Sequence, residues 1–352
     1  MSLFYGVTAL YVFTSGADRQ ATSFWFTFVA FLTKEQMDDR GRTQCGCLVC
    51  GSGLFGLLSV DLAHHHGAPS GSVLMQGNLE TIDFPSGELD LYGRLRHCAD
   101  DAPTLVLLSG LGFHTFEYEP LAAHLAASGF NSLSFDFQGH GRSGGRRGVW
   151  ILDQLAGDSR HAVDFARQRY RGPIGLFGNS LGAMVAILTA TNDDRVLGVA
   201  AANCPARIAD FLLTRTRRAL FALAKLVASL APIRISVNHF YSYDQLIDDR
   251  SWVSTFERDP LIADARRLSV TTFTTLLEHW DGPSAISRLH KPLLLIQGRN
   301  DHMQPPRQSQ LLFEAANNPK KYEVVETGHL PHLEDPKTLA GLLIDWFSGL
   351  TR

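Results

Sequence analysis

The chain has 352 residues, of which 45% are hydrophobic and 19% are charged, and its formal net charge at pH 7 is −3. These values are typical of a globular protein and exclude the broad positive field that nucleic-acid binding requires. The length suits one α/β domain that carries an insertion. Small molecules are therefore the expected partners, and nothing in the sequence indicates an oligomeric state.

Three of the five cysteines cluster as Cys45, Cys47 and Cys50, and five are too few for a disulfide framework in a chain of this length. A metal site would need a fourth ligand from elsewhere, such as His64–His66, whereas tetrahedral sites usually consist of two well-spaced pairs. We therefore expect no metal here, with a metal site as the alternative.

The first 74 residues show no sustained hydrophobic period and are interpreted as a poorly defined N-terminal extension to a domain of residues 75–352. No apolar run reaches the roughly 20 residues of a membrane-spanning helix. Leu3–Phe13 has the length of a signal peptide, but no basic residue precedes it and no small-residue cleavage pattern follows it. The sequence favours a cytoplasmic protein over a secreted one.

From residue 75 onward the hydrophobic pattern becomes regular. Thr81–Phe84 and Leu89–Arg96 alternate on either side of Pro85–Gly87, which predicts a β-hairpin. Short apolar runs then alternate with helical segments such as Leu121–Ala127 and Ile151–Tyr170. The runs expected to be strands are Thr104–Leu108, Ser132–Phe135, Ile174–Phe177, Val196–Ala202, Pro292–Ile296 and Tyr322–Val325. This alternation predicts an α/β fold with a mostly parallel central sheet and helices on both faces.

Residues 205–290 interrupt this alternation, because their hydrophobic pattern is typical of helices and contains no clear strand. Ligands of open α/β sheets bind at the carboxyl ends of the strands. We therefore interpret this segment as a helical lid insertion that covers the site.

Two segments match the string G-x-S-x-G, Gly141–Gly145 and Gly178–Gly182. A nucleophilic serine of this kind stands on a sharp turn between a strand and a helix. Ile174–Phe177 supplies the strand and Ala183–Ala190 the helix, so Ser180 is the expected nucleophile, and Ser143, in a loop rich in Gly and Arg, is the alternative.

A serine hydroxyl needs a histidine base and an acid that orients it, in the chain order Ser, acid, His on this fold. Asp301 follows a late strand and His329 lies between the last strand and the closing helix Leu339–Phe347, so these are the expected acid and base. Asp210 is the alternative acid and His332 the alternative base.

The tetrahedral intermediate needs two preorganised N–H donors, each worth about 3 to 4 kcal/mol. Position predicts that the N–H of Leu181, directly after the nucleophile, is one donor. The N–H of Leu111, in the loop after the strand Thr104–Leu108, is the other.

From residue 81 to residue 347 the chain resembles the α/β-hydrolase family of monoacylglycerol lipases, lysophospholipases and serine aminopeptidase-like hydrolases. Asp136–Gly148, the turn Gly178–Gly182 and Asp259–Leu261 carry the resemblance. Two departures are Ser109 in place of the family's His and Gln138 in place of its Arg. The resemblance implies an α/β-hydrolase fold and a serine esterase that needs no metal or organic cofactor.

Within the lid, residues 209–231 read as a basic amphipathic helix. Its apolar residues include Leu212, Leu220 and Leu223, which we expect to contact substrate, and its cations are Arg215, Arg217, Arg218 and Lys225. One interpretation is peripheral docking on lipid, and the other is packing of the apolar face on the sheet.

The favoured function is hydrolysis of carboxylic esters, such as those of monoacylglycerol or lysophospholipid, through a Ser-His-Asp triad and an acyl-enzyme. An amide, peptide or C–C bond hydrolase with the same triad is the second hypothesis. A non-catalytic ligand-binding member of the fold is the third, and the presence of all three triad residue types, Ser180, Asp301 and His329, argues against it.

Overall fold

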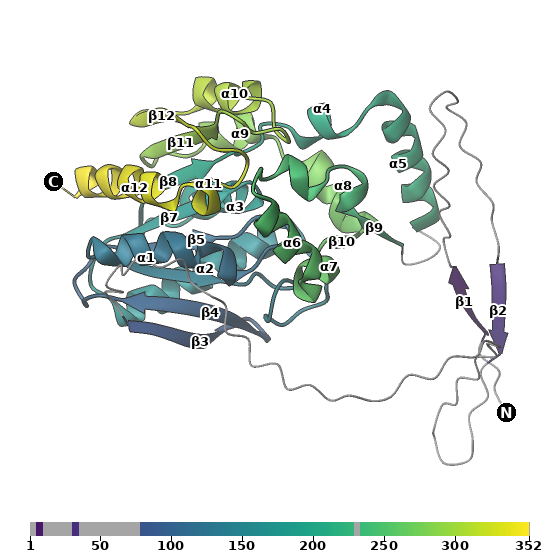
Figure 1. Cartoon of the computed structure of the whole chain (residues 1–352), viewed down its shortest axis with the longest axis horizontal. Coiled ribbons are helices and arrows are strands. Elements are labelled where there is room, and N and C mark those ends of the chain that lie inside the picture. Colours follow the sequence, from purple (N-terminus) through teal and green to yellow (C-terminus); the bar gives the residue numbers. More distant parts are fainter. Residues whose placement is uncertain (1–4, 10–29, 35–77, 229–232, 352) are drawn as a thin grey trace, which may run out of the picture. The chain divides into compact units, whose positions relative to one another are not determined.

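The structure, a computed structural model, describes residues 5–9, 30–34, 78–228 and 233–351 (Figure 1). The chain divides into two units, residues 1–70 and 71–352. In the first unit, β1 (Tyr5–Ala9) and β2 (Ala30–Lys34) pair antiparallel. The cysteine cluster and the histidine triplet lie outside the described residues, so the interpretation of residues 1–74 stays a prediction.

The second unit is built on an eight-stranded sheet in the order β12-β11-β8-β7-β5-β6-β4-β3 (Figure 1). Its strands are β3 (Asn78–Ser86), β4 (Leu89–His97), β5 (Thr104–Leu108), β6 (Asn131–Phe135), β7 (Ile174–Asn179), β8 (Val196–Ala202), β11 (Leu293–Gly298) and β12 (Lys320–Val325). β4 pairs antiparallel with β3 and β6, and the other neighbours are parallel. The predicted mostly parallel sheet is confirmed, and each predicted run coincides with a strand apart from Pro292, which precedes β11.

Helices cover both faces of this sheet. The alternation of strand side chains sends Leu105 and Leu107 of β5 toward α1 (Glu119–Ala127) and α12 (Pro336–Leu350). It sends Val106 and Leu108 toward α2 (Leu152–Arg169) and α3 (Leu181–Thr191). Because both faces are covered, β5 reads in the sequence as a continuous apolar run.

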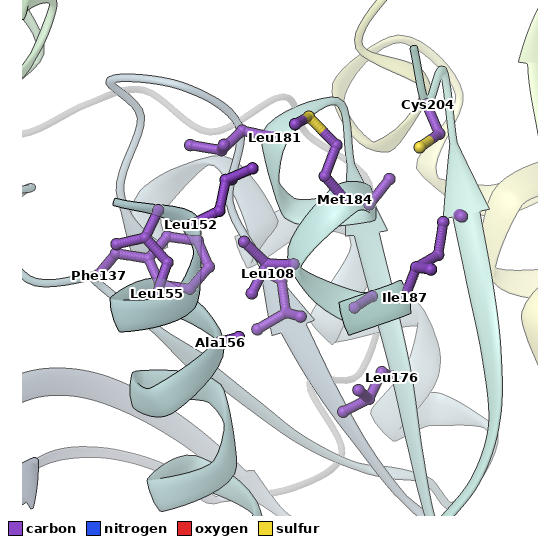
Figure 2. Close-up of a cluster of buried hydrophobic side chains, with 14 of the residues drawn as sticks. Leu108, Phe137, Leu152, Leu155, Ala156, Leu176, Leu181, Met184, Ile187 and Cys204 are labelled. Carbon is purple, nitrogen blue, oxygen red and sulfur yellow. The ribbon is translucent and has the colours of Figure 1, made fainter. Parts of the chain in front are cut away.

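Figure 2 shows a cluster of buried hydrophobic side chains that includes residues of α3. Leu181, Met184 and Ile187 of α3 pack with residues of α2 and of the sheet. Those partners include Leu152, Leu155, Ala156, Leu108 and Leu176. Removing this apolar area from water stabilises the fold by roughly 25 cal/mol per Å². The packing of these side chains therefore holds the start of α3 in a fixed position.

The segment between β8 and β11 forms the helical insertion (Figure 1). It contains α4 (Ile208–Leu212), α5 (Arg215–Ala228), α6 (Arg250–Arg258), α7 (Pro260–Ala265), α8 (Val270–His279), α9 (Gly282–Ser287) and the three-residue strands β9 (Arg234–Ser236) and β10 (Arg267–Ser269). This pair of strands is antiparallel and was not expected from the sequence. We call residues 205–290 the lid segment.

The single helix expected over residues 209–231 is two helices. Leu213 is extended, with φ −109° and ψ 102°, so α4 ends there. Thr214, which directly precedes α5, caps the start of that helix, because its hydroxyl accepts a hydrogen bond from the N–H of Arg217 at 3.3 Å. A threonine in the middle of a helical pattern therefore acts as a cap, and the sequence pattern did not reveal it.

Three further elements lie outside the lid segment, which itself also contains the 3₁₀ turns Val237–His239 and Tyr243–Gln245. A 3₁₀ turn, Thr115–Tyr118, follows the loop after β5, and α10 (Arg307–Ala315) lies between β11 and β12. α11 (Pro331–Glu334) separates β12 from α12. The loops after β5, β7, β11 and β12 all leave the carboxyl ends of parallel strands, and they carry the candidate site residues.

Candidate active site

Ser180 stands on the turn between β7 and α3 with φ 55° and ψ −113°, a backbone conformation that a residue with a Cβ rarely adopts. Its N–H donates to the carbonyl of Ala202 at 2.9 Å. A Cβ on Gly178 would lie 2.2 Å from the backbone of Gly182, and one on Gly182 would lie 1.8 Å from the carbonyl oxygen of Leu108. Both glycines of the string are therefore required by close backbone packing.

The structure brings Asp301 and His329 together. Nδ1 of His329 and Oδ2 of Asp301 are 2.7 Å apart, and both side chains are buried. The other carboxylate oxygen of Asp301 accepts the N–H groups of Met303 and Gln304 at 2.9 and 2.8 Å. An ionised Asp301 accepts a hydrogen bond from Nδ1–H, which leaves Nε2 of His329 unprotonated and able to act as a base.

Asn203, which the sequence reasoning missed, connects the acid and base loops. Its amide nitrogen donates to the carbonyl of His329 at 2.9 Å, and its amide oxygen accepts the N–H of Gly298 at 2.8 Å. It is buried and has a positive φ of 44°. A polar residue directly after the predicted strand Val196–Ala202 was the available signal. The alternative acid, Asp210, is exposed on α4.

Leu111 and Leu181, the expected oxyanion donors, line one cavity together with Ser180. Leu181 is the first residue of α3, where backbone N–H groups have no partner within the helix. The loop before Leu111 is held by Glu117, whose carboxylate accepts the N–H of Gly110 at 3.2 Å.

The cavity beside Ser180 has a volume of about 40 Å³, and Ser180 and Tyr241 are the lining residues whose side chains carry a polar group. The other lining residues are Met184, Pro205, Ile208, Phe211, Leu212, Val237, Phe273, Leu276 and Met303. A cavity needs about 10–15 Å³ to hold one water, so this space has room for a few waters. Leu212 lines the cavity, whereas the side chains of Leu220 and Leu223 lie outside the described part of the structure.

Three of the four cations of α5 contact protein groups, whereas the side chain of Arg215 lies outside the described part of the structure. Arg217 donates to the carbonyls of Leu212 and His239 at 3.1 and 3.3 Å. Arg218 donates to the carbonyl of Ala209 at 2.9 Å, and Lys225 pairs with Glu278 at 2.8 Å. These three cations therefore have protein partners in the structure, and the choice between packing and lipid docking stays a prediction.

Ser143, the alternative nucleophile, is built into the loop Asp136–Gly148. Its hydroxyl donates to the carbonyl of Asp136 and accepts the N–H of Tyr92 at 2.9 Å, and it is buried. Arg147 of the same loop donates to the carbonyls of His140 and Gly141 at 2.7 Å. Arg147 therefore fixes the conformation of this loop.

Two other buried histidines, His332 and His140, do not contact Asp301. His332, the alternative base, is fully buried and its Nε2 is 3.2 Å from a carboxylate oxygen of Glu117. Burial lowers the pKa of His140 to about 4, so this imidazole is neutral at pH 7.

Over the described residues there is no group of three or more His, Cys, Asp or Glu side chains that could hold a metal ion. Within the same ranges no helix combines the length and apolar composition that crossing a bilayer requires.

Comparison with known proteins found relatives of this chain. A family model described as serine aminopeptidase, S33, matches residues 100–335. Human monoglyceride lipase is 31% identical over 238 residues, which cover 65% of this chain and 75% of that protein. Monoacylglycerol lipase of Mycolicibacterium smegmatis is 25% identical over 222 residues, covering 61% of this chain and 76% of that protein.

Solved structures show the same fold. Monoacylglycerol lipase of Paleococcus ferrophilus aligns with a TM-score of 0.60 at 24% identity and covers 74% of this chain and 99% of that one. A soluble variant of monoglyceride lipase from Saccharomyces cerevisiae aligns with a TM-score of 0.64 at 16% identity, over 81% of this chain and 99% of that one.

The protein is thus a serine ester hydrolase with the α/β-hydrolase fold. The chain belongs to the serine aminopeptidase S33 family, which confirms the resemblance found in the sequence.

Proposed function

We propose that this enzyme hydrolyses acyl esters of the monoacylglycerol or lysophospholipid type, with Ser180 as nucleophile, His329 as base and Asp301 as the orienting acid. The observation that carries the assignment is the buried 2.7 Å contact between Asp301 and His329. Met303, whose N–H holds the Asp301 carboxylate, lines the same cavity as Ser180, so the acid loop and the serine turn border one space.

In the proposed mechanism, His329 removes the proton of the Ser180 hydroxyl as its oxygen attacks the ester carbonyl carbon. The N–H groups of Leu111 and Leu181 donate to the resulting oxyanion. His329 then protonates the leaving alcohol, and the C–O bond to it breaks. Water repeats the cycle on the acyl-enzyme, releasing the carboxylic acid and restoring Ser180. Asp301 orients the imidazole throughout.

The apolar lining of the cavity supports an aliphatic acyl group as the part of the substrate that lies against the lid segment. Relatives with the printed names monoglyceride lipase and monoacylglycerol lipase support the same choice. The lining offers no cluster of charged or hydrogen-bonding side chains, which a peptide substrate would use to fix its backbone.

A fluorophosphonate reagent tests the nucleophile, because it forms a covalent bond with an activated serine. We expect labelling of the wild type and its complete loss in Ser180→Ala. Ser143→Ala is the matched control, since it removes the serine of the second G-x-S-x-G string, and it should still be labelled. Folded wild type that does not react would contradict the assignment.

The bond that is cleaved is tested by comparing p-nitrophenyl esters, a monoacylglycerol and an aminoacyl amide. We expect the esters to be hydrolysed with the highest kcat/KM. A higher kcat/KM for the amide would favour the alternative of an amide or peptide hydrolase with the same triad.

A further inference from the structure

Arg266 is the largest fully buried side chain of the described residues, and it lies beside the loop that carries Leu111. It follows α7 and precedes β10, and its carbonyl accepts the N–H of Val237 at 3.0 Å. Its aliphatic stem lies across Gly112, where an added Cβ would be 2.2 Å from Cγ of Arg266. The arginine is therefore packed against the residue that directly follows Leu111.

The guanidinium group of Arg266 has no counterion among the described residues. Nε donates to the side-chain oxygen of Asn238 at 2.8 Å, whereas Nη1 and Nη2 are buried without a hydrogen-bond partner in this part of the chain. The rings of Tyr241 and Tyr243 lie 4.8 and 4.6 Å from Cζ. Arg96, another buried arginine, is neutralised by Glu119 at 3.1 Å. The fold therefore pairs Arg96 and leaves Arg266 unpaired.

An unpaired buried charge is costly. Arginine stays protonated in proteins, and removing its charge from water costs several kcal/mol unless an anion compensates it. Two desolvated cation–π contacts offset about 2 kcal/mol each, but ring faces do not accept the four hydrogens of Nη1 and Nη2. An anionic oxygen group is the partner that this arrangement lacks, since a carboxylate or phosphate can accept both nitrogens at once.

Arg266 borders the cavity of Ser180 through its neighbours. Tyr241, whose ring lies over the guanidinium, lines that cavity, and so do Val237 and Leu111. We propose that Arg266 is a specificity-determining residue that binds a carboxylate or phosphate on the alcohol part of an ester substrate, reached when Tyr241 turns aside. This inference rests on the proposed esterase function, and it selects anionic esters over neutral ones.

The test compares three lauroyl esters that differ only in the alcohol part, namely glycerol, glycerol 3-phosphate and glycolate, each below its critical micelle concentration. We expect the wild-type enzyme to have a kcat/KM at least tenfold higher for one of the two anionic esters than for the glycerol ester. The phosphate and carboxylate substrates distinguish the two kinds of anion.

Arg266→Met keeps the aliphatic stem on Gly112 and removes the charge. We expect it to reduce the ratio of anionic to neutral kcat/KM at least tenfold, mainly by raising KM for the anionic ester. Arg267→Met is the matched control, because Arg267 is the exposed neighbour, and it should leave the ratio unchanged. A wild type without anionic preference, or a preference that survives Arg266→Met, would overturn the proposal.

A measurement on the wild type does not depend on the folding of a variant. Glycerol 3-phosphate or glycolate should slow fluorophosphonate labelling of Ser180, whereas glycerol and sodium chloride at matched ionic strength should not. Equal labelling rates in all four solutions would contradict the anion site while leaving the serine hydrolase intact. If Ser180 is labelled in none of the four solutions, the result would instead contradict the proposed function.

Discussion

Glu117 and His332 face each other at 3.2 Å, both completely buried, although 215 positions separate them in the sequence. The second carboxylate oxygen of Glu117 accepts the N–H of Gly110, next to the proposed donor Leu111. His332 lies in α11, three residues after the proposed base His329. This pair therefore joins the loop that would hold the oxyanion to the loop that would supply the base.

Replacing Glu117 with Ala should impair catalysis, because Gly110 loses its acceptor and the N–H of Leu111 loses its fixed direction. Removing an oxyanion donor lowers kcat by about 10²–10³-fold, and we expect a decrease near the lower value with little change in KM. Glu117→Gln keeps an acceptor oxygen and should recover most of kcat. Equal kcat values in folded Glu117→Ala and wild type would contradict this role.

Asp301→Asn should reduce kcat by about 10⁴-fold, because an amide no longer holds the imidazole of His329 in the tautomer that the base requires. Steady-state kinetics on a p-nitrophenyl ester measures the change. Asp153→Asn, which removes an exposed carboxylate of α2, is the control and should retain wild-type kcat. A normal kcat in Asp301→Asn would exclude Asp301 as the orienting acid.

Features of the fold that depend on a local residue pattern could be predicted from the sequence. The apolar runs of the central sheet and the G-x-S-x-G turn are short contiguous signals, and the order Ser180, Asp301, His329 is a property of the chain. The contacts of Glu117 with His332 and of Arg266 with Gly112 join segments far apart in the sequence, so no local period reveals them. The break at Thr214 was missed because capping competes with an otherwise helical pattern.

Alanine substitutions at a glycine of the serine turn and at a glycine of α12 should have opposite outcomes. Gly182→Ala would place a Cβ 1.8 Å from the carbonyl oxygen of Leu108, so we expect a poorly folded and inactive protein. Gly341→Ala on α12 meets nothing within 4 Å and should raise the free energy of unfolding by about 1 kcal/mol. Urea denaturation measures both changes. A stable and active Gly182→Ala would show that the turn tolerates a side chain.

Replacing Gln138 with Arg should raise the free energy of unfolding. Gln138 stands where the resembling family has Arg, and its N–H and side-chain amide donate to the carboxylate of Asp158 at 2.9 and 3.3 Å. Burial raises the pKa of Asp158 above the ordinary value of 3.8. A carboxyl whose pKa is raised on folding loses stability as pH rises above its unfolded pKa, because its charged form is disfavoured in the native state.

Gln138→Arg should supply a cation and raise the free energy of unfolding by about 1 to 2 kcal/mol at pH 7. The gain should be smaller at pH 4 than at pH 7, because burial raises the pKa of Asp158 and protonation removes the anion of the pair. The same substitution in an Asp158→Asn background is the control and should produce no gain. Urea denaturation at both pH values measures the effect, and an equal gain in both backgrounds would exclude the ion pair as its cause.

Substitution of the cations of α5 distinguishes packing of this helix on the protein from docking on lipid. Arg217 and Arg218 donate to backbone carbonyls of the lid segment, and Lys225 pairs with the exposed Glu278. Replacing all three with Gln should lower the thermal stability of the lid segment and increase its cleavage by protease, because these hydrogen bonds are lost. Flotation with anionic vesicles should not change, since groups already bound to protein contribute little to binding a lipid surface. A clear loss of flotation in the folded triple variant would favour docking on lipid instead.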